Sequence, residues 1–292
     1  MKSFGYHLLM VLTVVLLLST FSCAPAAPSV SAASTLEPGD SERTVMVNDE
    51  QRSYLLHIPA GLDMAHSAPL VFAFHGAGSE PSDMELSAGL KELADTSGFL
   101  LVYPLGLGLT WNAGTCCDYA VQQNIDDVAF VRQILTDLET VTKIDPKRIY
   151  ATGFSNGAAM VYRLACEMSD TFAAVAPVAG SLLIESCQPS QPVSLIDVHG
   201  LKDLSAPYEG GGGLDLPPMQ ELIKNWAQLD DCTDSPKVEK EKIFTHTAYA
   251  SCNAGTAVEH YAIEEGGHAW PSKYAWDASQ AIWDFFAAHP KQ

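Results

Sequence analysis

The stretch Gly153-Phe154-Ser155-Asn156-Gly157 decides how the rest of this chain is interpreted. It follows the β-compatible run Arg148-Ile149-Tyr150-Ala151-Thr152 and precedes an apolar, helix-compatible segment. A G-x-S-x-G serine between a strand and a helix indicates a nucleophile elbow, a sharp turn that holds the serine hydroxyl at the edge of a sheet. The glycines are needed because such a turn brings backbone close to backbone. We therefore expect Ser155 to be a nucleophile.

The rest of the chain predicts an α/β fold. Strand-like runs lie at residues 44–47, 53–58, 70–74, 100–103, 149–153, 173–178, 193–198 and 258–263. Helix-compatible stretches lie at residues 84–97, 126–141, 158–168, 219–229 and 278–288. The run at 70–74 is apolar throughout, as a strand covered on both faces would be. The alternation predicts a mostly parallel central sheet with helices on both faces, and an active site at the carboxyl ends of its strands.

Two candidate partners for Ser155 also follow strand-like runs. Asp203 lies past the run at 193–198, where a carboxylate can accept a hydrogen bond from a catalytic histidine, whereas its rival Asp197 lies within that run. His268 follows the last strand-like run next to two glycines, and His199 is its strongest competitor. The chain order serine, aspartate, histidine is the one expected for an α/β-hydrolase triad.

The segment His75-Gly76-Ala77-Gly78 directly follows the run at 70–74. Gly-rich backbone at this place can direct N–H groups at a developing oxyanion. We expect the N–H groups of Ala77 and Asn156 to be the oxyanion donors. The alternative is a tight turn that only ends the strand.

Two tryptophans and two aspartates have more than one interpretation. Trp111 and Trp270 either form walls of a substrate pocket, since aromatic faces suit an aryl or short acyl group, or belong to the core. Asp126 and Asp127 open a helical run, where acidic residues cap the helix or interact favourably with its dipole.

Four segments together resemble one family. They are Trp111-Asn112-Ala113-Gly114-Thr115-Cys116-Cys117, Asp126-Asp127-Val128-Ala129-Phe130, Ala151-Thr152-Gly153-Phe154-Ser155-Asn156-Gly157 and Gly267-His268-Ala269-Trp270-Pro271. In order and spacing, from about residue 52 to 290, they resemble the polyhydroxybutyrate depolymerase/feruloyl esterase family of secreted serine esterases.

The resemblance implies an α/β-hydrolase fold and a Ser155–His268–Asp203 triad that needs no metal or cofactor. It also implies an ester substrate: feruloyl or acetyl esters of plant polysaccharide, or poly(3-hydroxybutyrate) oligomers. The chain departs from the family pattern at Leu201 and Lys202, where relatives often carry smaller or polar residues. It also shows no segment resembling the domain with which many polymer-degrading members bind solid polyester.

The N-terminus predicts export. Lys2 precedes an uncharged apolar run at 8–18, which suits a signal peptide over residues 1–22. Thr20-Phe21-Ser22-Cys23 is an imperfect lipobox, so Cys23 is a candidate lipidation site and would be the protein's only membrane attachment. Cleavage later, within the Ala/Pro/Ser tract, is the alternative. We expect residues 23–41 to form a linker, residues 42–292 to form one catalytic domain, and the protein to be a secreted or extracytoplasmic monomer.

Charge and cysteine count limit the partners and predict cross-links. The formal net charge of −19 argues against a nucleic-acid partner, which requires a basic surface. Without Cys23, six cysteines remain, an even number that allows three disulfides and 15 pairings in an exported protein. We expect Cys232 to pair with Cys252, and Cys116 and Cys117 to reach separately to Cys166 and Cys187. No cysteine or histidine spacing indicates a zinc site.

Two other functions compete with an esterase. A serine peptidase would use the same fold and triad, but peptidase relatives usually add an N-terminal propeller or cap, and the region before Leu70 is too short for one. A non-catalytic envelope lipoprotein with a hydrolase-like fold would typically have lost a triad residue, and this chain retains all three.

Overall fold

The computed structural model describes Met1, Gly5, residues 36–271 and residues 276–292. Apart from Met1 and Gly5, the predicted signal peptide lies outside these residues, and so do Cys23 and the predicted linker up to residue 35. The chain divides into two units, Met1–Ser34 and Thr35–Gln292, and the second contains every element described below. None of the helices in the described ranges combines the length and hydropathy that a bilayer-crossing segment requires.

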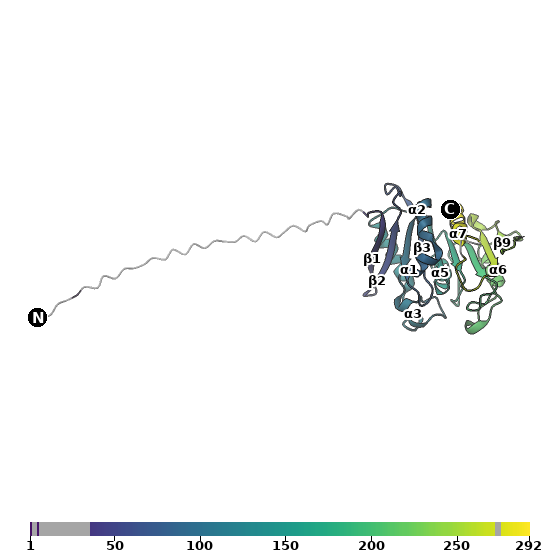
Figure 1. The fold of residues 1–292 in the computed structure, drawn as a ribbon, viewed down its shortest axis with the longest axis horizontal. Coiled ribbons are helices and arrows are strands. Elements are labelled where there is room, and N and C mark those ends of the chain that lie inside the picture. The colour runs from purple at the N-terminus through teal and green to yellow at the C-terminus, as the bar shows by residue number, and fades with distance from the viewer. Residues whose placement is uncertain (2–4, 6–35, 272–275) are drawn as a thin grey trace. The chain divides into compact units, whose positions relative to one another are not determined.

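Within the described residues, ten strands form one sheet (Figure 1). They are β1 (Gly39–Val47), β2 (Glu50–Ile58), β3 (Ala68–Phe74), β4 (Leu100–Pro104), β5 (Ile144–Phe154), β6 (Ala174–Val178), β7 (Ser194–Gly200), β8 (Lys237–Lys240), β9 (Phe244–Tyr249) and β10 (Val258–Ile263). Their order is β1-β2-β4-β3-β5-β6-β7-β10-β9-β8. The run from β4 to β10 is parallel, and an antiparallel pair extends it at each edge.

Helices cover both faces of this sheet. They are α1 (Pro81–Ala88), α2 (Leu90–Ser97), α3 (Asp118–Gln122), α4 (Asp127–Glu139), α5 (Asn156–Glu167), α6 (Met219–Leu229) and α7 (Ala278–Ala288). Alternate residues of β3 belong to two separate cores, because successive side chains of a strand point to opposite faces. Leu70 and Phe72 pack in a core with α4, α5 and α6, whereas Val71 and Ala73 pack in a core with α1, α2 and α7. The predicted α/β architecture, with a mostly parallel sheet between two helical layers, is confirmed.

Three details differ from the sequence-based expectation. The helix expected at 84–97 is two helices, because Gly89 adopts a left-handed conformation with φ of 62° and ends α1. The strands β8 and β9 and the short helix α3 were not expected. Every residue of β8 is exposed and every residue of β9 is half-buried, so neither strand carries the buried/exposed alternation that reveals a strand in sequence.

The disulfides confirm one predicted pair and correct the others. Cys232 pairs with Cys252, as expected. Cys166 pairs with Cys187, and Cys116 pairs with its neighbour Cys117, so the expected separate links from Cys116 and Cys117 are wrong. The segment after β6 returns to the end of α5 and brings Cys187 to Cys166, which leaves the adjacent cysteines with each other.

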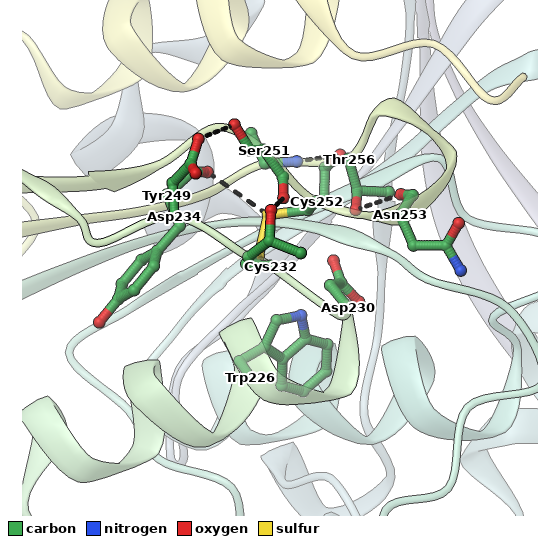
Figure 2. Close-up of a disulfide and its surroundings, with 12 residues drawn as sticks. Trp226, Asp230, Cys232, Asp234, Tyr249, Ser251, Cys252, Asn253 and Thr256 are labelled. Atoms are coloured by element: carbon green, nitrogen blue, oxygen red, sulfur yellow. Dashed lines mark hydrogen bonds between the residues drawn. A yellow bond between two sulfur atoms is a disulfide. The ribbon is translucent and has the colours of Figure 1, made fainter.

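A buried carboxyl group lies beside the Cys232–Cys252 disulfide, where the chain leaves α6 (Figure 2). Asp230 is completely buried; its Oδ1 accepts a hydrogen bond from the N–H of Val193 at 3.2 Å. Its Oδ2 has no hydrogen-bond partner among the described residues. Burial, with a smaller contribution from the neighbouring Asp231, raises the pKa of Asp230 to about 7. The folded protein therefore favours the neutral form of this side chain.

This burial predicts a pH-dependent stability that Asp230→Asn should remove. Since the pKa is higher in the folded state than in the unfolded chain, the contribution of Asp230 to stability is greatest below about pH 4 and is lost as the pH rises to about 7. The loss is on the order of 4 kcal/mol. We expect denaturant unfolding to show that, between pH 4 and pH 8, the unfolding free energy of Asp230→Asn rises by about 4 kcal/mol relative to that of the native protein.

Asp49→Asn is the matched control, because Asp49 is exposed in the turn between β1 and β2 and does not contribute to the raised pKa of Asp230. Its unfolding free energy should follow that of the native protein at each pH. Parallel stability curves for the native protein and Asp230→Asn would contradict the assignment.

Candidate active site

Ser155 lies at the turn between β5 and α5 in a backbone conformation that residues other than glycine seldom adopt. Its φ is 55° and its ψ is −117°. Such a conformation costs about 1–3 kcal/mol and persists only where the surroundings enforce it. One constraint is the hydrogen bond that the N–H of Ser155 donates to the carbonyl oxygen of Val178 on β6, at 3.0 Å. The turn has the geometry expected of a nucleophile elbow.

The first turn of α5 is in close contact with the end of β3. A Cβ atom at Gly157 would lie 2.3 Å from the carbonyl oxygen of Phe74 and 2.5 Å from that of His75. A Cβ atom at Gly153 would lie 2.6 Å from the carbonyl oxygen of Gly157. All three distances are shorter than a carbon and an oxygen atom can approach without bonding, so both glycines of the motif are required by packing.

Ser155, His268 and Asp203 form a hydrogen-bonded array at the carboxyl ends of β5, β7 and β10. The Ser155 hydroxyl donates to Nε2 of His268 over 2.9 Å. Nδ1–H of His268 donates to Oδ2 of Asp203 over 2.8 Å. Asp203 is buried, whereas His268 and Ser155 are half-buried. The imidazole can therefore remove the serine proton while the carboxylate fixes its tautomer and stabilises its charged form.

The carboxylate of Asp203 also stabilises the loop on which Asp203 lies. Oδ1 of Asp203 accepts hydrogen bonds from the N–H groups of Ser205 and Ala206, each at 2.8 Å. His199, the competitor for the base, is buried, and its Nε2–H donates to the carbonyl oxygen of Ala206 at 2.7 Å. His199 therefore braces the aspartate loop and is not the partner of Ser155.

Asp197, the competitor for the acid, belongs to a second buried network. Its carboxylate accepts hydrogen bonds from Nδ1–H of His260 at 2.8 Å and from the hydroxyl of Tyr162 at 2.9 Å. The hydroxyl of Tyr208 completes the network by donating to Nε2 of His260 at 3.1 Å. Burial, with the charge of Asp197, raises the pKa of Tyr162 well above its ordinary value. This network ties α5, β7 and β10 together beside the triad.

Of the two expected oxyanion donors, Ala77 lies in the loop after β3 and Asn156 directly follows Ser155. No acceptor in the described residues pairs with the N–H of Ala77, and Ala77 is exposed. Asn156 is the first residue of α5, so its N–H is one of those that a helix leaves without an internal partner. The loop of Ala77 is braced by His75, whose Nε2 accepts from the N–H of Gly106 and whose Nδ1–H donates to the carbonyl oxygen of Gly76. Burial lowers the pKa of His75, which favours this neutral form.

The side chain of Asn156 is clamped by the backbone of Trp111. Its Oδ1 accepts from the N–H of Trp111 at 2.7 Å, and its Nδ2 donates to the carbonyl oxygen of Trp111 at 3.1 Å. The indole N–H of Trp111 in turn donates to the carbonyl oxygen of His75 at 2.9 Å. These bonds join the two expected oxyanion segments through one residue.

A buried ion pair supports the segment after Trp111. Asp127 accepts from Arg52 at 2.8 Å with one oxygen and from the N–H of Asn112 at 2.7 Å with the other. The Arg52 guanidinium also lies 4.0 Å from the centre of the Phe130 ring. Asp126 and Asp127 were expected to cap helix α4 or to interact favourably with its dipole. Asp126 caps the helix by accepting a hydrogen bond from the N–H of Ala129, whereas Asp127 pairs with Arg52.

The tryptophans that sequence suggested as pocket walls lie inside the protein. Trp111 is completely buried, and Trp270 is 8% exposed, with its indole N–H donating to Ser279 at 3.0 Å. Their surroundings favour the core interpretation. Among the described residues, the aromatic ring in contact with His268 is that of Phe154, which is half-buried and has its centre 4.9 Å from that of the His268 ring. The only signal in the sequence that Phe154 belongs to the site was its position inside the G-x-S-x-G motif.

An apolar pocket of about 370 Å³ adjoins the histidine loop. The backbone of Gly267 and Ala269 lines it together with Ile243, Ile263 and Trp276, but neither Ser155 nor His268 does. Within the described residues, no group of His, Cys, Asp or Glu side chains is arranged to hold a metal ion.

Comparison with known proteins identifies the chain's relatives. Residues 52–207 match the family model described as esterase PHB depolymerase. The chain is 30% identical over 243 residues to feruloyl esterase B of Piromyces equi, covering 77% of this chain and 44% of that protein. It is 28% identical over 244 residues to poly(3-hydroxyalkanoate) depolymerase C of Paucimonas lemoignei, covering 74% and 58% respectively. The chain thus spans about half the length of these relatives.

Solved structures agree on the fold. An acetyl xylan esterase from Aspergillus awamori superposes with a TM-score of 0.63 at 15% identity, covering 85% of this chain and 99% of that one. At this identity the likeness concerns the fold alone. The fold is that of an α/β-hydrolase, as the sequence predicted.

The contact between α5 and β3 predicts that Gly157→Ala destabilises the protein. The added methyl group would collide with the carbonyl oxygens of Phe74, the last residue of the buried strand β3, and of His75, so the backbone must shift. We expect a loss of about 1–3 kcal/mol in unfolding free energy, measured by chemical denaturation. Gly61→Ala is the control, since a Cβ atom there meets no atom within 4 Å. Equal stability of the two variants would contradict the close contact.

Proposed function

The chain belongs to the esterase PHB depolymerase family, and from this premise we propose that it is a serine esterase with Ser155, His268 and Asp203 as its catalytic residues. The observation that carries the proposal is the array of hydrogen bonds from Ser155 through His268 to Asp203, at 2.9 and 2.8 Å. The strained conformation of Ser155 supports it, because such strain gathers at functional sites.

The proposed reaction begins with acyl transfer to the serine. Oγ of Ser155 attacks the ester carbonyl carbon while its proton moves to Nε2 of His268. The resulting oxyanion receives hydrogen bonds from the N–H groups of Ala77 and Asn156. The bond to the alcohol oxygen then breaks, and that oxygen takes the proton from Nε2. The alcohol leaves, and the acyl group stays on Ser155.

Water completes the cycle. His268 removes a proton from a water molecule, and the hydroxide oxygen attacks the acyl carbonyl. The bond to Oγ breaks, the carboxylic acid leaves, and Ser155 regains its proton from Nε2. Asp203 stabilises the charged imidazole in both halves of the reaction.

We propose carboxylic esters of the kinds that the relatives' names indicate: feruloyl or acetyl esters of plant polysaccharide, or poly(3-hydroxybutyrate) oligomers. The three disulfides of the described part support an oxidising, extracytoplasmic location. A signal peptide over residues 1–22, lipidation at Cys23 and a monomeric state complete the proposal. A substrate panel of methyl ferulate, acetylated xylan and a soluble hydroxybutyrate oligomer distinguishes the acyl groups.

Ser155→Ala should abolish hydrolysis of p-nitrophenyl acetate while leaving the fold intact. Removing the nucleophile of a triad costs on the order of 10⁴-fold or more in kcat. Ser87→Ala is the control, because the Ser87 hydroxyl lies outside the site and bonds only within α1. Retained hydrolysis by Ser155→Ala with an unchanged circular dichroism spectrum would overturn the proposal, and failure of a fluorophosphonate to label the native protein would favour a non-catalytic protein. Cleavage of a peptide amide more rapidly than any ester would favour a peptidase.

The clamp on Asn156 predicts a smaller effect, confined to catalysis. Asn156→Ala removes both hydrogen bonds to Trp111, so the first N–H of α5 is held less firmly against the oxyanion. Losing a donor outright costs about 10²–10³ in kcat, and a donor that is only less well held should cost about tenfold. Steady-state kinetics with p-nitrophenyl acetate should show kcat falling and KM staying within about twofold. A rise in KM with unchanged kcat would mean that Asn156 serves substrate binding instead.

A further inference from the structure

A groove of about 790 Å³ lies between α6 and the edge strands of the sheet, outside the triad. Its floor is one face of β9 and β10. Thr245, Thr247 and Tyr249 of β9 line it, and so does His260 of β10. In the sheet register Thr247 lies opposite His260 on one side and opposite Val238 of β8 on the other. The groove therefore has a continuous floor made by three neighbouring strands.

This face of β9 is polar, whereas the opposite face is aromatic. Phe244 and His246 alternate with the threonines and contact the Tyr261 ring, Phe244 edge-on and His246 stacked, with ring centres 5.1 and 4.2 Å apart. The pattern Phe-Thr-His-Thr-Ala-Tyr thus separates ring contacts on one face from hydroxyl groups on the other. Helix α6 covers β10 through Ile223, which shares a core with Ala262, so the polar face of β9 remains beside the helix.

Two hydroxyl groups in the groove have no partner in the protein. Within the described residues, neither the hydroxyl of Thr247 nor that of Tyr249 makes a hydrogen bond, although both residues are half-buried. Figure 2 shows the Tyr249 ring directed away from the Cys232–Cys252 disulfide. By contrast, the hydroxyl of Thr245 donates to Glu264 at 3.4 Å. The two unpaired hydroxyls are available to a ligand.

The floor of the groove is rigid where it meets the protein interior. Tyr208 lines the groove, and its hydroxyl is fixed by His260, whose other nitrogen donates to the buried Asp197. All three side chains are at least nine-tenths buried. A ligand here would meet a preorganised surface, so little conformational freedom is lost on binding.

The groove begins at the edge of the sheet that carries the triad. Leu201 lines it and precedes Asp203 by two residues, just past the end of β7. Glu264 also lines it and precedes His268 by four residues, just past the end of β10. The loops that hold the acid and the base therefore form one end of the groove. A group attached to an ester at Ser155 could extend from this end along β9.

We propose that this groove binds the sugar chain of a neutral polysaccharide whose ester is cleaved at Ser155. The inference rests on the proposed esterase function and selects among its substrates. Sugar hydroxyls both donate and accept, which matches Thr247 and Tyr249. The groove is lined by two positive and two negative side chains, so its charge favours no ionic ligand. These side chains offer both hydrogen-bond donors and acceptors. They are Lys224, Lys240, Glu221 and Glu264.

A polyester chain fits this lining poorly. Poly(3-hydroxybutyrate) presents carbonyl oxygens and methyl groups and, apart from its end, no hydrogen-bond donor. It would desolvate the carboxylate of Glu221 without supplying a donor, which costs free energy. An oligosaccharide supplies a hydroxyl donor at nearly every position. The tyrosine ring of Tyr249 additionally offers a flat face to the C–H side of a sugar ring.

The test uses xylohexaose, an unesterified neutral oligosaccharide, and the full-length Ser155→Ala protein. We expect isothermal titration calorimetry to detect binding of xylohexaose and none of a 3-hydroxybutyrate trimer at equal concentration. The double variant Thr247→Val/Tyr249→Phe deletes the two free hydroxyls and keeps the side-chain shapes. It should weaken xylohexaose binding about tenfold or more, since each neutral hydrogen bond contributes about 0.5–1.5 kcal/mol. Thr136→Val is the matched control, because Thr136 is exposed on α4 and its hydroxyl bonds only within its own helix.

Kinetics on the protein with Ser155 intact complete the test. The double variant should leave kcat/KM for p-nitrophenyl acetate within about twofold and raise KM for feruloylated xylo-oligosaccharide about tenfold. No binding of xylohexaose by a folded protein that hydrolyses p-nitrophenyl acetate would overturn the groove and leave the esterase in place. Trimer binding that the double variant weakens would overturn the choice of ligand. Loss of the esterase itself would appear separately, as a native protein that hydrolyses no ester.

Discussion

The contact between the first turn of α5 and the carboxyl end of β3 is the constraint on which the site depends. The backbone of Gly157 lies against the carbonyl oxygens of Phe74 and His75, at a separation that leaves no room for a Cβ atom. Because helix and strand meet this closely, the residue between them must turn sharply, and Ser155 takes the positive φ that such a turn needs. The same contact brings the first turn of α5 against His75, where the loop of Ala77 begins. Packing of backbone on backbone thus places the nucleophile and both expected oxyanion donors at once.

Buried polar groups then fix the surrounding loops. His75 braces the Ala77 loop, His199 braces the Asp203 loop, and Asp127 holds the segment that clamps Asn156. Each of these groups has to be desolvated, and each recovers much of that cost through hydrogen bonds with defined directions. An apolar core would pack as well but would not select one loop geometry. The arrangement explains why a chain with several histidines beside the site brings only His268, the half-buried one, to Ser155.

The sequence predicted what local pattern and chain order determine. The parallel sheet follows from apolar runs separated by helices, and the elbow follows from five consecutive residues. The β8–β9 hairpin was missed because its strands are exposed or half-buried on both faces. The pairing of Cys166 with Cys187 depends on where the segment after β6 returns, which no local pattern encodes. Trp111 was ambiguous for the same reason: its burial results from contacts with His75 and Asn156, which are remote in sequence.

The loop from Leu201 to Tyr208 joins the triad to the groove. Asp203 lies within this loop and orients His268. Leu201 and Tyr208, at the two ends of the loop, line the groove. Tyr208 is tied to His260, and Ala206 to His199, so a movement of the loop strains these hydrogen bonds. A ligand that presses on Tyr208 would therefore also act on the position of the acid. In such an arrangement, binding energy gained far from the ester can be used to align the base, which raises kcat and not only affinity.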